Sequence, residues 1–328
     1  MNSFGRIFRV HIFGESHGIN IGAVIDGCPA GIPLTEDDLE PDLARRRAGA
    51  EGTTPRKESD IPRIVSGTYN GKTTGAPLTV LFENLNTKSE DYDKLRQHPR
   101  PGHADYAAMV KFNKFNDPRG GGHFSARITL GLVVAGAIAK KILGNVQVKA
   151  YIKEVGGNPD IEAGLKAAIE AKDSVGGLIE CTCNNLPIGL GEPFFDSIES
   201  SIAHIAFSIP AVKGIEFGSG FEAARMYGSQ HNDVFIDEAG TTATNNAGGI
   251  NGGLTNGNEL IFRLAIKPAS SISRPQQTYN FEHKQVEELI IGGRHDVCVA
   301  LRAPVIVEAA AAIVLADFAL LSHTPNRT

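Results

Sequence analysis

Alternating hydrophobic and polar positions predict several β-strands along the chain. In residues 6–13, the side chains of Phe8, Val10 and Ile12 fall on one side, and residues 20–25 follow as the expected hairpin partner. Short apolar or alternating runs predict further strands at residues 77–82, 147–153, 177–183 and 259–266. Each run has the length of an ordinary strand and ends near residues typical of turns.

Helical spacing appears in longer segments between these strands. Residues 129–143 and 304–321 are mostly apolar, so we expect two buried helices, with glycine and alanine permitting close packing in the first. Residues 162–172 are amphipathic, and residues 280–291 are also predicted to be helical. Thr35 is expected to cap a helix with acidic residues in its first turn and three arginines in its last, an order that suits the helix dipole.

The order of these elements indicates the fold class. Strands come in runs and are then followed by helices, without a regular strand–helix alternation. This favours an α+β layered fold over a doubly wound parallel sheet. With no evident linker, repeat or charge block, we expect a single domain over residues 1–328, with a loose tail after Leu321.

Composition adds one anomaly, a surplus of glycine. The chain has 37 glycines among 328 residues, about 11% against the usual ~7%. There is no Gly-X-Y period, and proline plus glycine make up about 16% of the chain, below the ~25–30% of low-complexity chains, so the glycines must lie in ordered loops or close backbone contacts. The net charge of −5 lacks the basic footprint of a nucleic-acid-binding protein.

Cysteine usage and the chain start suggest a reducing, cytoplasmic setting. Cys181 and Cys183 alternate within a predicted strand, and no CxxC pair is present. The first residues carry charges inside an apolar stretch, unlike a signal peptide. No uninterrupted apolar run reaches the length of a membrane span, so we expect neither a membrane nor a nucleic acid as partner.

Two glycine-containing segments imitate nucleotide-binding motifs. Residues 218–223 (GSGFEA) fit a dinucleotide fingerprint, but the segment that follows reaches Gly228 too soon for a crossover helix. Residues 70–75 (NGKTTG) resemble a P-loop, but Ser66 stands where its first glycine is required. We therefore expect a tight turn at the first segment and a hairpin turn at the second.

Other segments combine glycine with arginine, histidine or lysine. Glycines let backbone N–H groups approach an anion, and arginines bind phosphate or carboxylate through two hydrogen bonds. Histidines can serve as general acids near neutral pH. The segments are residues 14–18 (GESHG), 100–106 (RPGHADY), 119–127 (RGGGHFSAR), 245–258 (NNAGGINGGLTNGN), 267–271 (KPASS) and 292–296 (GGRHD). The candidate arginines are Arg45, Arg46, Arg47, Arg100, Arg119, Arg127 and Arg294.

Each of these segments alone has a simpler structural explanation, such as a loop histidine, a flexible turn or a helix cap. Together they predict an enzyme that acts on a small polyanion with a phosphate-bearing cofactor. The residues by themselves leave the reaction open.

In this order, these motifs resemble those of the chorismate synthase family, from Gly5 to about Ala310. The resemblance implies an α+β sandwich with helices between antiparallel sheets, assembled as a homotetramer. It also implies conversion of 5-enolpyruvylshikimate 3-phosphate to chorismate and phosphate, the last step of the shikimate pathway. This trans-1,4-elimination by a phosphate-lyase requires reduced FMN without net redox change, and NADPH is one source of the reducing equivalents in relatives.

The resemblance also implies roles for individual residues. His17 resembles the acid that serves the phosphate leaving group, His103 the group that protonates or hydrogen-bonds reduced FMN, and Asp296 the base that acts through the flavin. The implied substrate clamps are Arg46, Arg100 and Arg127. The implied FMN contacts are His123, Phe124, Ser125, Pro210, Ala211, Gly252, Lys267, Pro268, Ala269, Ser270, Ser271 and Arg294.

The sequence departs from the family pattern at a few of these places. His123 and Phe124 replace the usual arginine and serine, and Pro210 stands where asparagine is common. Val297 replaces a proline, and the segment after Arg47 is one residue shorter and lacks a further arginine. Backbone contacts to FMN are expected to persist at the first two positions, whereas the usual side-chain contacts are not.

Three alternatives are considered beside this function. One is a nicotinamide-dependent flavin reductase, and a second is a non-catalytic protein that binds flavin or an anion. A third possibility is a metal bound by His98 and His103, for which no third ligand is evident in the sequence. We therefore expect no metal in the site.

Overall fold

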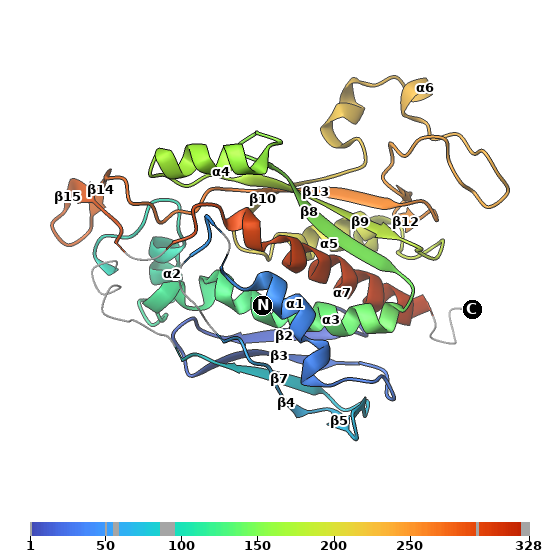
Figure 1. The fold of residues 1–328 in the computed structure, drawn as a ribbon, viewed down its shortest axis with the longest axis horizontal. Helices are drawn as coiled ribbons and strands as arrows, with labels where there is room; N and C mark the ends of the chain where they lie inside the picture. Colours follow the sequence, from blue (N-terminus) through green and yellow to red (C-terminus); the bar gives the residue numbers. More distant parts are fainter. Residues whose placement is uncertain (1, 50, 55–58, 86–95, 293–294, 323–328) are drawn as a thin grey trace.

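The computed structural model describes residues 2–49, 51–54, 59–85, 96–292 and 295–322. Two antiparallel sheets form its outer layers (Figure 1). The first has the order β1-β2-β3-β7-β4. Its strands are β1 (Ser3–Phe4), β2 (Arg9–Gly14), β3 (Asn20–Asp26), β7 (Leu78–Glu83) and β4 (Arg63–Ser66).

The second sheet is also antiparallel and has the order β10-β13-β9-β8. Its strands are β10 (Val212–Phe217), β13 (Leu260–Ile266), β9 (Gly177–Asn184) and β8 (Gln147–Val155). Cys181 and Cys183 are both fully buried on one face of β9, as their alternation predicts. All four cysteines of the chain are buried and free, so no disulfide supports the fold.

Helices fill the space between the sheets (Figure 1). They are α1 (Glu40–Arg46), α3 (Leu130–Leu143), α5 (Ile198–Ala206) and α7 (Pro304–Ser322), whereas α4 (Ile161–Glu170) covers the outer side of the second sheet. The helix α3 packs on β2 and β3, and α7 packs on β8 and β9. A Cβ on Gly136 of α3 would lie 2.3 Å from that of Ala309, so this glycine permits the close contact between α3 and α7.

This arrangement confirms the predicted α+β fold with helices between antiparallel sheets. By length and composition α7 could cross a membrane, but 78% of its most apolar window is buried inside the protein. It is therefore a core helix. The expected loose tail starts at Ser322, the last residue of α7, and its remaining residues, 323–328, lie outside the described part of the chain.

The predicted helix at residues 280–291 is wrong. The segment instead forms the hairpin of β14 (Gln276–Asn280) and β15 (Gln285–Leu289). Asn280 decides the turn, because its Oδ1 accepts hydrogen bonds from the backbone N–H groups of Glu282 and His283. Such side-chain bonds to the local backbone compete with helix formation.

The helix predicted after Thr35 begins later than expected. A short 3₁₀ turn, η1 (Glu36–Asp38), comes first, and the regular helix α1 starts at Glu40 with Pro41 in its first turn. The Thr35 backbone N–H donates to the Asp38 carboxylate at 2.8 Å. Proline suits this position because it lacks the N–H that the first helical turn leaves unpaired.

Both imitations of nucleotide-binding motifs form turns, as predicted. Residues 70–71 close the hairpin of β5 (Thr68–Tyr69) and β6 (Lys72–Thr73). Residues 218–223 lead into the 3₁₀ segment η6 (Gly220–Arg225), which is followed by the short helix α6 (Gly228–His231). The segments η6 and α6 belong to an arm that projects beyond the second sheet (Figure 1). A third hairpin, β11 (Ile250–Asn251) and β12 (Leu254–Thr255), lies near its base.

Candidate active site

A cavity of about 690 Å³ collects most of the predicted site residues. Its walls come from the end of α1, the 3₁₀ segments η3 (Arg119–Phe124) and η4 (Ala126–Thr129), the start of β10, residues 267–271 directly after β13 and the segment η7 (Val299–Arg302). The predicted residues that line it are Arg46, Arg100, His103, His123, Phe124, Ser125, Arg127, Pro210, Ala211, Lys267, Pro268, Ala269, Ser270, Ser271 and Asp296.

His17 lies directly behind one wall of this cavity. Gly120, which lines the cavity, has φ of +60°, and a Cβ there would be only 2.7 Å from Nε2 of His17. Only glycine can occupy this place, because a side chain would be strained and would strike the imidazole. The His17 side chain is buried and is separated from the cavity by the backbone of Gly120.

Arg46 and Arg127 form a buried cationic pair around Asp60. Arg127 donates from Nη1 to Asp60 at 2.8 Å and from Nε to Asn84 at 2.6 Å. Arg46 donates to Thr129 and to the carbonyl of Ala126, while its Nη1 lies 3.6 Å from Asp60. One carboxylate thus faces two guanidinium groups, which leaves excess positive charge at the cavity wall.

The Nη1 atom of Arg46 is buried and has no hydrogen-bond partner among the described residues. Burial, followed by repulsion from Arg302 and Arg127, lowers the pKa of Arg46 to about 9. That value is still above neutral, so the guanidinium stays charged at a cost in free energy. An anionic ligand within reach would offset this cost.

Asp296 lies on the cavity wall, held from two sides. One carboxylate oxygen accepts a hydrogen bond from the backbone N–H of Thr54 at 2.8 Å, and the other is 3.6 Å from Nη1 of Arg302. The neighbouring His295 also lines the cavity. Burial lowers the pKa of His295, and the charge of Arg100 adds to this shift, so the imidazole is neutral at neutral pH.

Arg100 and His103 meet at the other side of the cavity. Nη2 of Arg100 lies 3.1 Å from Nδ1 and 3.3 Å from Nε2 of His103. Both residues also contact Asp105, the first residue of α2 (Asp105–Lys111). Nη1 of Arg100 donates to Ser271 at 3.1 Å, which connects the RPGHADY segment to the KPASS segment.

A second link between these two segments runs through a backbone carbonyl. Ser270 donates to the carbonyl oxygen of Gly102 at 2.8 Å, and Nζ of Lys267 donates to the same oxygen at 2.5 Å. The backbone N–H of Lys267 donates to Ala211, whose φ of +73° is strained for a residue with a side chain. Two predicted cofactor segments and the RPGHADY segment therefore support one another at the cavity wall.

His123 and Phe124, two of the positions where the sequence departs from the expected family pattern, face different surroundings. His123 has both ring nitrogens near protein oxygens, with Nδ1 at 2.7 Å from Gly14 O and Nε2 at 3.1 Å from Asn2 Oδ1. Phe124 stays partly exposed and packs at a tilted angle near Phe112. The phenyl ring thus offers an apolar contact to the cavity.

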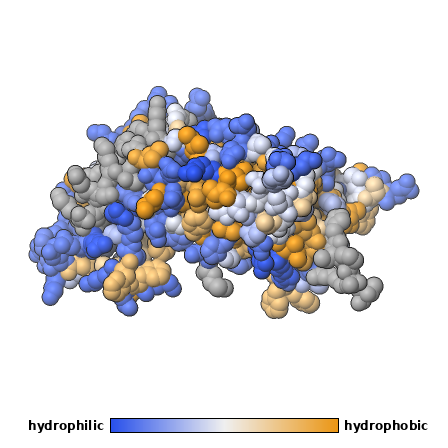
Figure 2. Space-filling view, turned by 90° about the horizontal axis from the view of Figure 1, so that it is seen from below, coloured by the Kyte–Doolittle hydropathy of each residue, from blue (hydrophilic) through white to orange (hydrophobic). Residues whose placement is uncertain are grey.

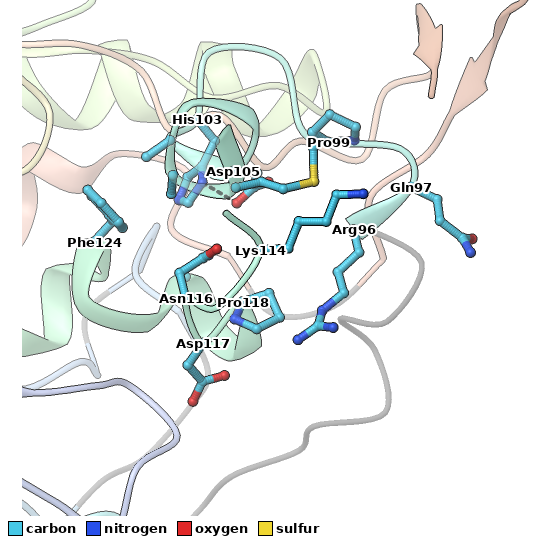
Figure 3. A pocket seen from close by; sticks show the side chains of 14 residues that line it. Arg96, Gln97, Pro99, His103, Asp105, Lys114, Asn116, Asp117, Pro118 and Phe124 are labelled. Atoms are coloured by element: carbon cyan, nitrogen blue, oxygen red, sulfur yellow. Dashed lines mark ion pairs between the residues drawn. The ribbon is translucent and has the colours of Figure 1, made fainter. Parts of the chain in front are cut away.

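A smaller cavity of about 190 Å³ lies behind His103 (Figure 3). His103, Ala104 and Phe124 line both cavities, so they form part of the wall between them. Figure 3 shows Asp105 and His103 pointing toward one another beside this smaller cavity. Asp105 lines only the smaller one.

Two predicted cofactor contacts are not placed in the cavity. Gly252 lies in the two-residue turn between β11 and β12, where a Cβ would meet only open space, and it takes no part in the lining. Arg294 lies outside the described residues. Both remain predictions.

Arg45 and Arg47 have partners of their own. Arg45 pairs with Glu308 of α7, and Arg47 pairs with Glu40 while also lining the cavity. His98 contacts the carbonyl of Thr278. Within the described residues no group of three histidine, cysteine, aspartate or glutamate side chains is arranged to hold a metal ion.

Sequence reasoning missed three charged residues of the site, Asp60, Asp105 and Arg302. Asp105 stands within the RPGHADY segment, two positions after His103, so its proximity could have been inferred from the motif. Asp60 and Arg302 carry no local signal, because their partners are distant in the sequence.

Comparison with known proteins adds independent findings. A family model described as "Chorismate synthase" matches residues 8–320. The chain is 64% identical to a "Chorismate synthase" from Chitinophaga pinensis, over 100% of this chain and 99% of the relative. It is 44% identical to a "Chorismate synthase" from Opitutus terrae, over 96% of each chain. A solved structure titled "Crystal Structure of Chorismate Synthase" matches with a TM-score of 0.74 and 28% identity, over 97% of this chain and 93% of that one.

Proposed function

The chain belongs to the chorismate synthase family, and from this premise we propose that the large cavity is where it binds its substrate and reduced FMN. The family activity is that of a phosphate-lyase, which converts 5-enolpyruvylshikimate 3-phosphate to chorismate in the last step of the shikimate pathway. The observation that carries the proposal is the excess of buried arginine around Asp60 in that cavity.

The substrate carries one phosphate and two carboxylates, which must leave water without losing their charge partners. We assign Arg46, Arg100 and Arg127 to this task. Each guanidinium is buried and lines the cavity. Charged hydrogen bonds of this kind contribute about 1.5–3 kcal/mol each, enough to offset much of the desolvation cost.

The lining also fits a flavin. A volume of about 690 Å³ lies within the size range of ligand pockets. Lys267 and Ser270 offer polar groups for the FMN phosphate, and Phe124 and Ala211 offer apolar and backbone contacts. When bound, reduced FMN would supply the electron density that assists departure of the phosphate group. The protein would bind and orient both molecules and exclude water.

Two side chains are proposed to handle the protons. His17, in its buried place behind Gly120, donates a proton to the departing phosphate oxygen. Asp296 accepts a proton, and its hydrogen bond from Thr54 fixes one carboxylate oxygen. The two roles separate the acid and the base, as an elimination requires.

The alternatives find less support. The GSGFEA segment forms a 3₁₀ turn and no crossover helix, which argues against a dinucleotide fold there. NADPH as the reductant of FMN remains a prediction, and NADPH oxidation by the protein with added FMN tests it. A protein that only binds flavin or an anion would need neither the proton donor assigned to His17 nor the proton acceptor assigned to Asp296.

We propose a homotetramer in the cytoplasm, with neither nucleic acid nor a membrane as partner. Large apolar side chains are exposed, including Phe194 and Phe195. Apolar residues also gather toward the middle of the face in Figure 2. A second copy would cover such surface and is also the way for the Gly252 turn to reach a cavity. Light scattering of the purified protein tests the assembly.

The decisive experiment is an anaerobic assay with chemically reduced FMN and 5-enolpyruvylshikimate 3-phosphate. We expect release of phosphate together with the absorbance of chorismate. Binding of FMN and substrate without phosphate release would support the non-catalytic alternative. Failure to bind either molecule would refute the assignment of the cavity.

A further inference from the structure

Asp105 binds two residues of the candidate site and lines only the smaller cavity behind them. Its Oδ1 lies 2.5 Å from Nδ1 of His103, and its Oδ2 lies 2.7 Å from Nε of Arg100. We propose that Asp105 is a positioning residue for the reaction, which fixes the tautomer of His103 and the direction of the Arg100 guanidinium. The proposal rests on the proposed function, since that function gives His103 and Arg100 their ligands.

The contact with His103 determines where the imidazole carries its proton. An ionised carboxylate can only accept hydrogen bonds, so Nδ1 of His103 must be the donor. In the neutral ring Nε2 then carries the lone pair, which can accept a hydrogen bond from Nη2 of Arg100 at 3.3 Å or a proton from a ligand. Without the carboxylate, nothing in the observed geometry would favour this tautomer over the other.

The contact with Arg100 determines where its guanidinium points. Asp105 accepts from both Nε and Nη2, at 2.7 and 2.8 Å, which fixes one edge of the planar group. The remaining nitrogen, Nη1, is thereby directed to Ser271 on the wall of the large cavity. The same carboxylate also accepts from the backbone N–H of Arg100 at 3.1 Å, which ties the loop to α2.

Asp105 is suited to this task because it stays ionised. Burial alone would raise its pKa, but the hydrogen bonds from Arg100 and His103 outweigh burial and hold the pKa well below its usual range. The side chain is 13% exposed and faces the smaller cavity, as Figure 3 shows. Its effect on a ligand in the large cavity must therefore pass through His103 and Arg100.

The first test is Asp105→Asn, read by nitrogen NMR of histidine-labelled protein without ligands. We expect His103 to hold its proton on Nδ1 in the wild type and to become a mixture of tautomers in the variant. Asp105→Glu keeps the charge and should restore most of the Nδ1–H form. The matched control is Glu180→Gln, because Glu180 is another buried carboxylate bound to an arginine, Arg263, but lies in β9 away from the cavity. That control should leave the His103 signal unchanged.

The second test is a double-mutant cycle on turnover with Asp105→Asn and His103→Ala. Asp105→Asn should lower kcat by about 10-fold or more, since removal of the partners that orient metal-bound histidines costs about 10- to 100-fold. The part of this loss that passes through His103 should vanish where His103 is already alanine, so the double variant should lose clearly less than the product of the two single losses. An unchanged tautomer in Asp105→Asn, or losses that simply multiply, would overturn the proposal.

The two tests separate this proposal from the proposed function. The NMR signal reports whether Asp105 fixes the tautomer of His103, and this measurement requires no enzyme activity. If His103→Ala keeps full turnover, the role assigned to His103 in the reaction is refuted. The link from Asp105 through His103 to the reaction is then refuted too, even if Asp105→Asn shifts the tautomer. If His103→Ala is inactive and the tautomer stays fixed in Asp105→Asn, only the role of Asp105 is refuted.

Discussion

Arg45 of α1 and Glu308 of α7 form a bidentate ion pair, in which Nη1 and Nη2 of Arg45 lie 2.7 and 2.6 Å from the two carboxylate oxygens of Glu308. Glu308 is 2% exposed and also binds Lys140 of α3 and the backbone N–H of Ala150 in β8. One carboxylate therefore joins three elements to the central helix. The next residue along the chain, Arg46, faces the cavity instead.

This pairing predicts a dependence of stability on pH. Burial opposes the ionisation of Glu308, but its bonds to Arg45 and Lys140 outweigh burial and lower its pKa. The carboxylate thus stabilises the fold fully above the unfolded value of about 4.3, and this contribution is lost as the pH falls from there through the folded pKa. Urea unfolding between neutral and acid pH should show Glu308→Gln less stable at pH 7 by about 3 kcal/mol.

The same variant should lose less stability on acidification than the wild type does. Glu222→Gln is the control, because Glu222 forms an exposed pair with Arg225 whose removal changes stability by at most about 1 kcal/mol. An equal acid sensitivity in wild type and Glu308→Gln would contradict the prediction.

Arg46→Met should separate binding from stability. Burial of the Arg46 charge costs free energy in the protein without ligand, so an apolar side chain of similar size should leave the melting temperature unchanged or raise it. Substrate affinity should fall by about ten- to a hundred-fold, the equivalent of one charged hydrogen bond. Calorimetry with the substrate measures both quantities.

Arg45→Met offers the opposite result as a control. It removes the partner of Glu308 and should lower the melting temperature while leaving substrate affinity intact. Identical changes in melting temperature and substrate affinity in the two variants would refute the assignment of Arg46 to binding and of Arg45 to stability.

His17→Ala and Asp296→Asn should each lower turnover by about 10²-fold or more, in line with general acid–base contributions. The physical reason is the loss of the proton donor and of the proton acceptor at the cavity. Turnover is measured without oxygen, with reduced FMN in excess. His11→Ala serves as control, since His11 is exposed on β2 and contacts Ser3. Near-normal turnover in either site variant would remove its assigned role.

Gly252→Asn tests a predicted FMN contact that the structure leaves outside the cavity. Its φ of +59° and the open space around it should let asparagine fold there with little cost. If a second copy of the chain brings this turn to a cavity, FMN affinity should fall while the melting temperature stays unchanged. Gly240→Asn is the matched control, a left-handed glycine in open space that takes no part in the cavity lining. Unchanged FMN affinity in Gly252→Asn would exclude Gly252 from the site.

The sequence predicted the layers of the fold well because their signals are local. Alternation marks one buried face, so the pairing of residues 9–14 with 21–26 follows from the pattern around Val10. The helix predicted at residues 280–291 was wrong because the Asn280 side chain favours a turn, and hydrophobic periodicity does not reveal such side-chain hydrogen bonds.

Most of the residues that the sequence proposed for the site do line the cavity, but their geometry and some of their charged partners could not be predicted. Glycine and arginine motifs identified Arg46 and Arg127, yet nothing along the chain shows that both face Asp60. Such pairings arise only when distant segments pack together. The same holds for Asp296, whose partners Thr54 and Arg302 come from separate parts of the sequence.

The cavity draws its lining from Asn2 to Arg302, and the helix that separates the sheets, α7, begins only at Pro304. During synthesis, which proceeds at about 5–20 residues per second, the inner face of the second sheet leaves the ribosome before α7, the helix that packs on β8 and β9. A nascent chain that ends before Pro304 should expose this apolar face and bind chaperones, which ribosome-arrested fragments would reveal. The lining of the cavity is thus complete only when nearly all of the fold has been synthesised.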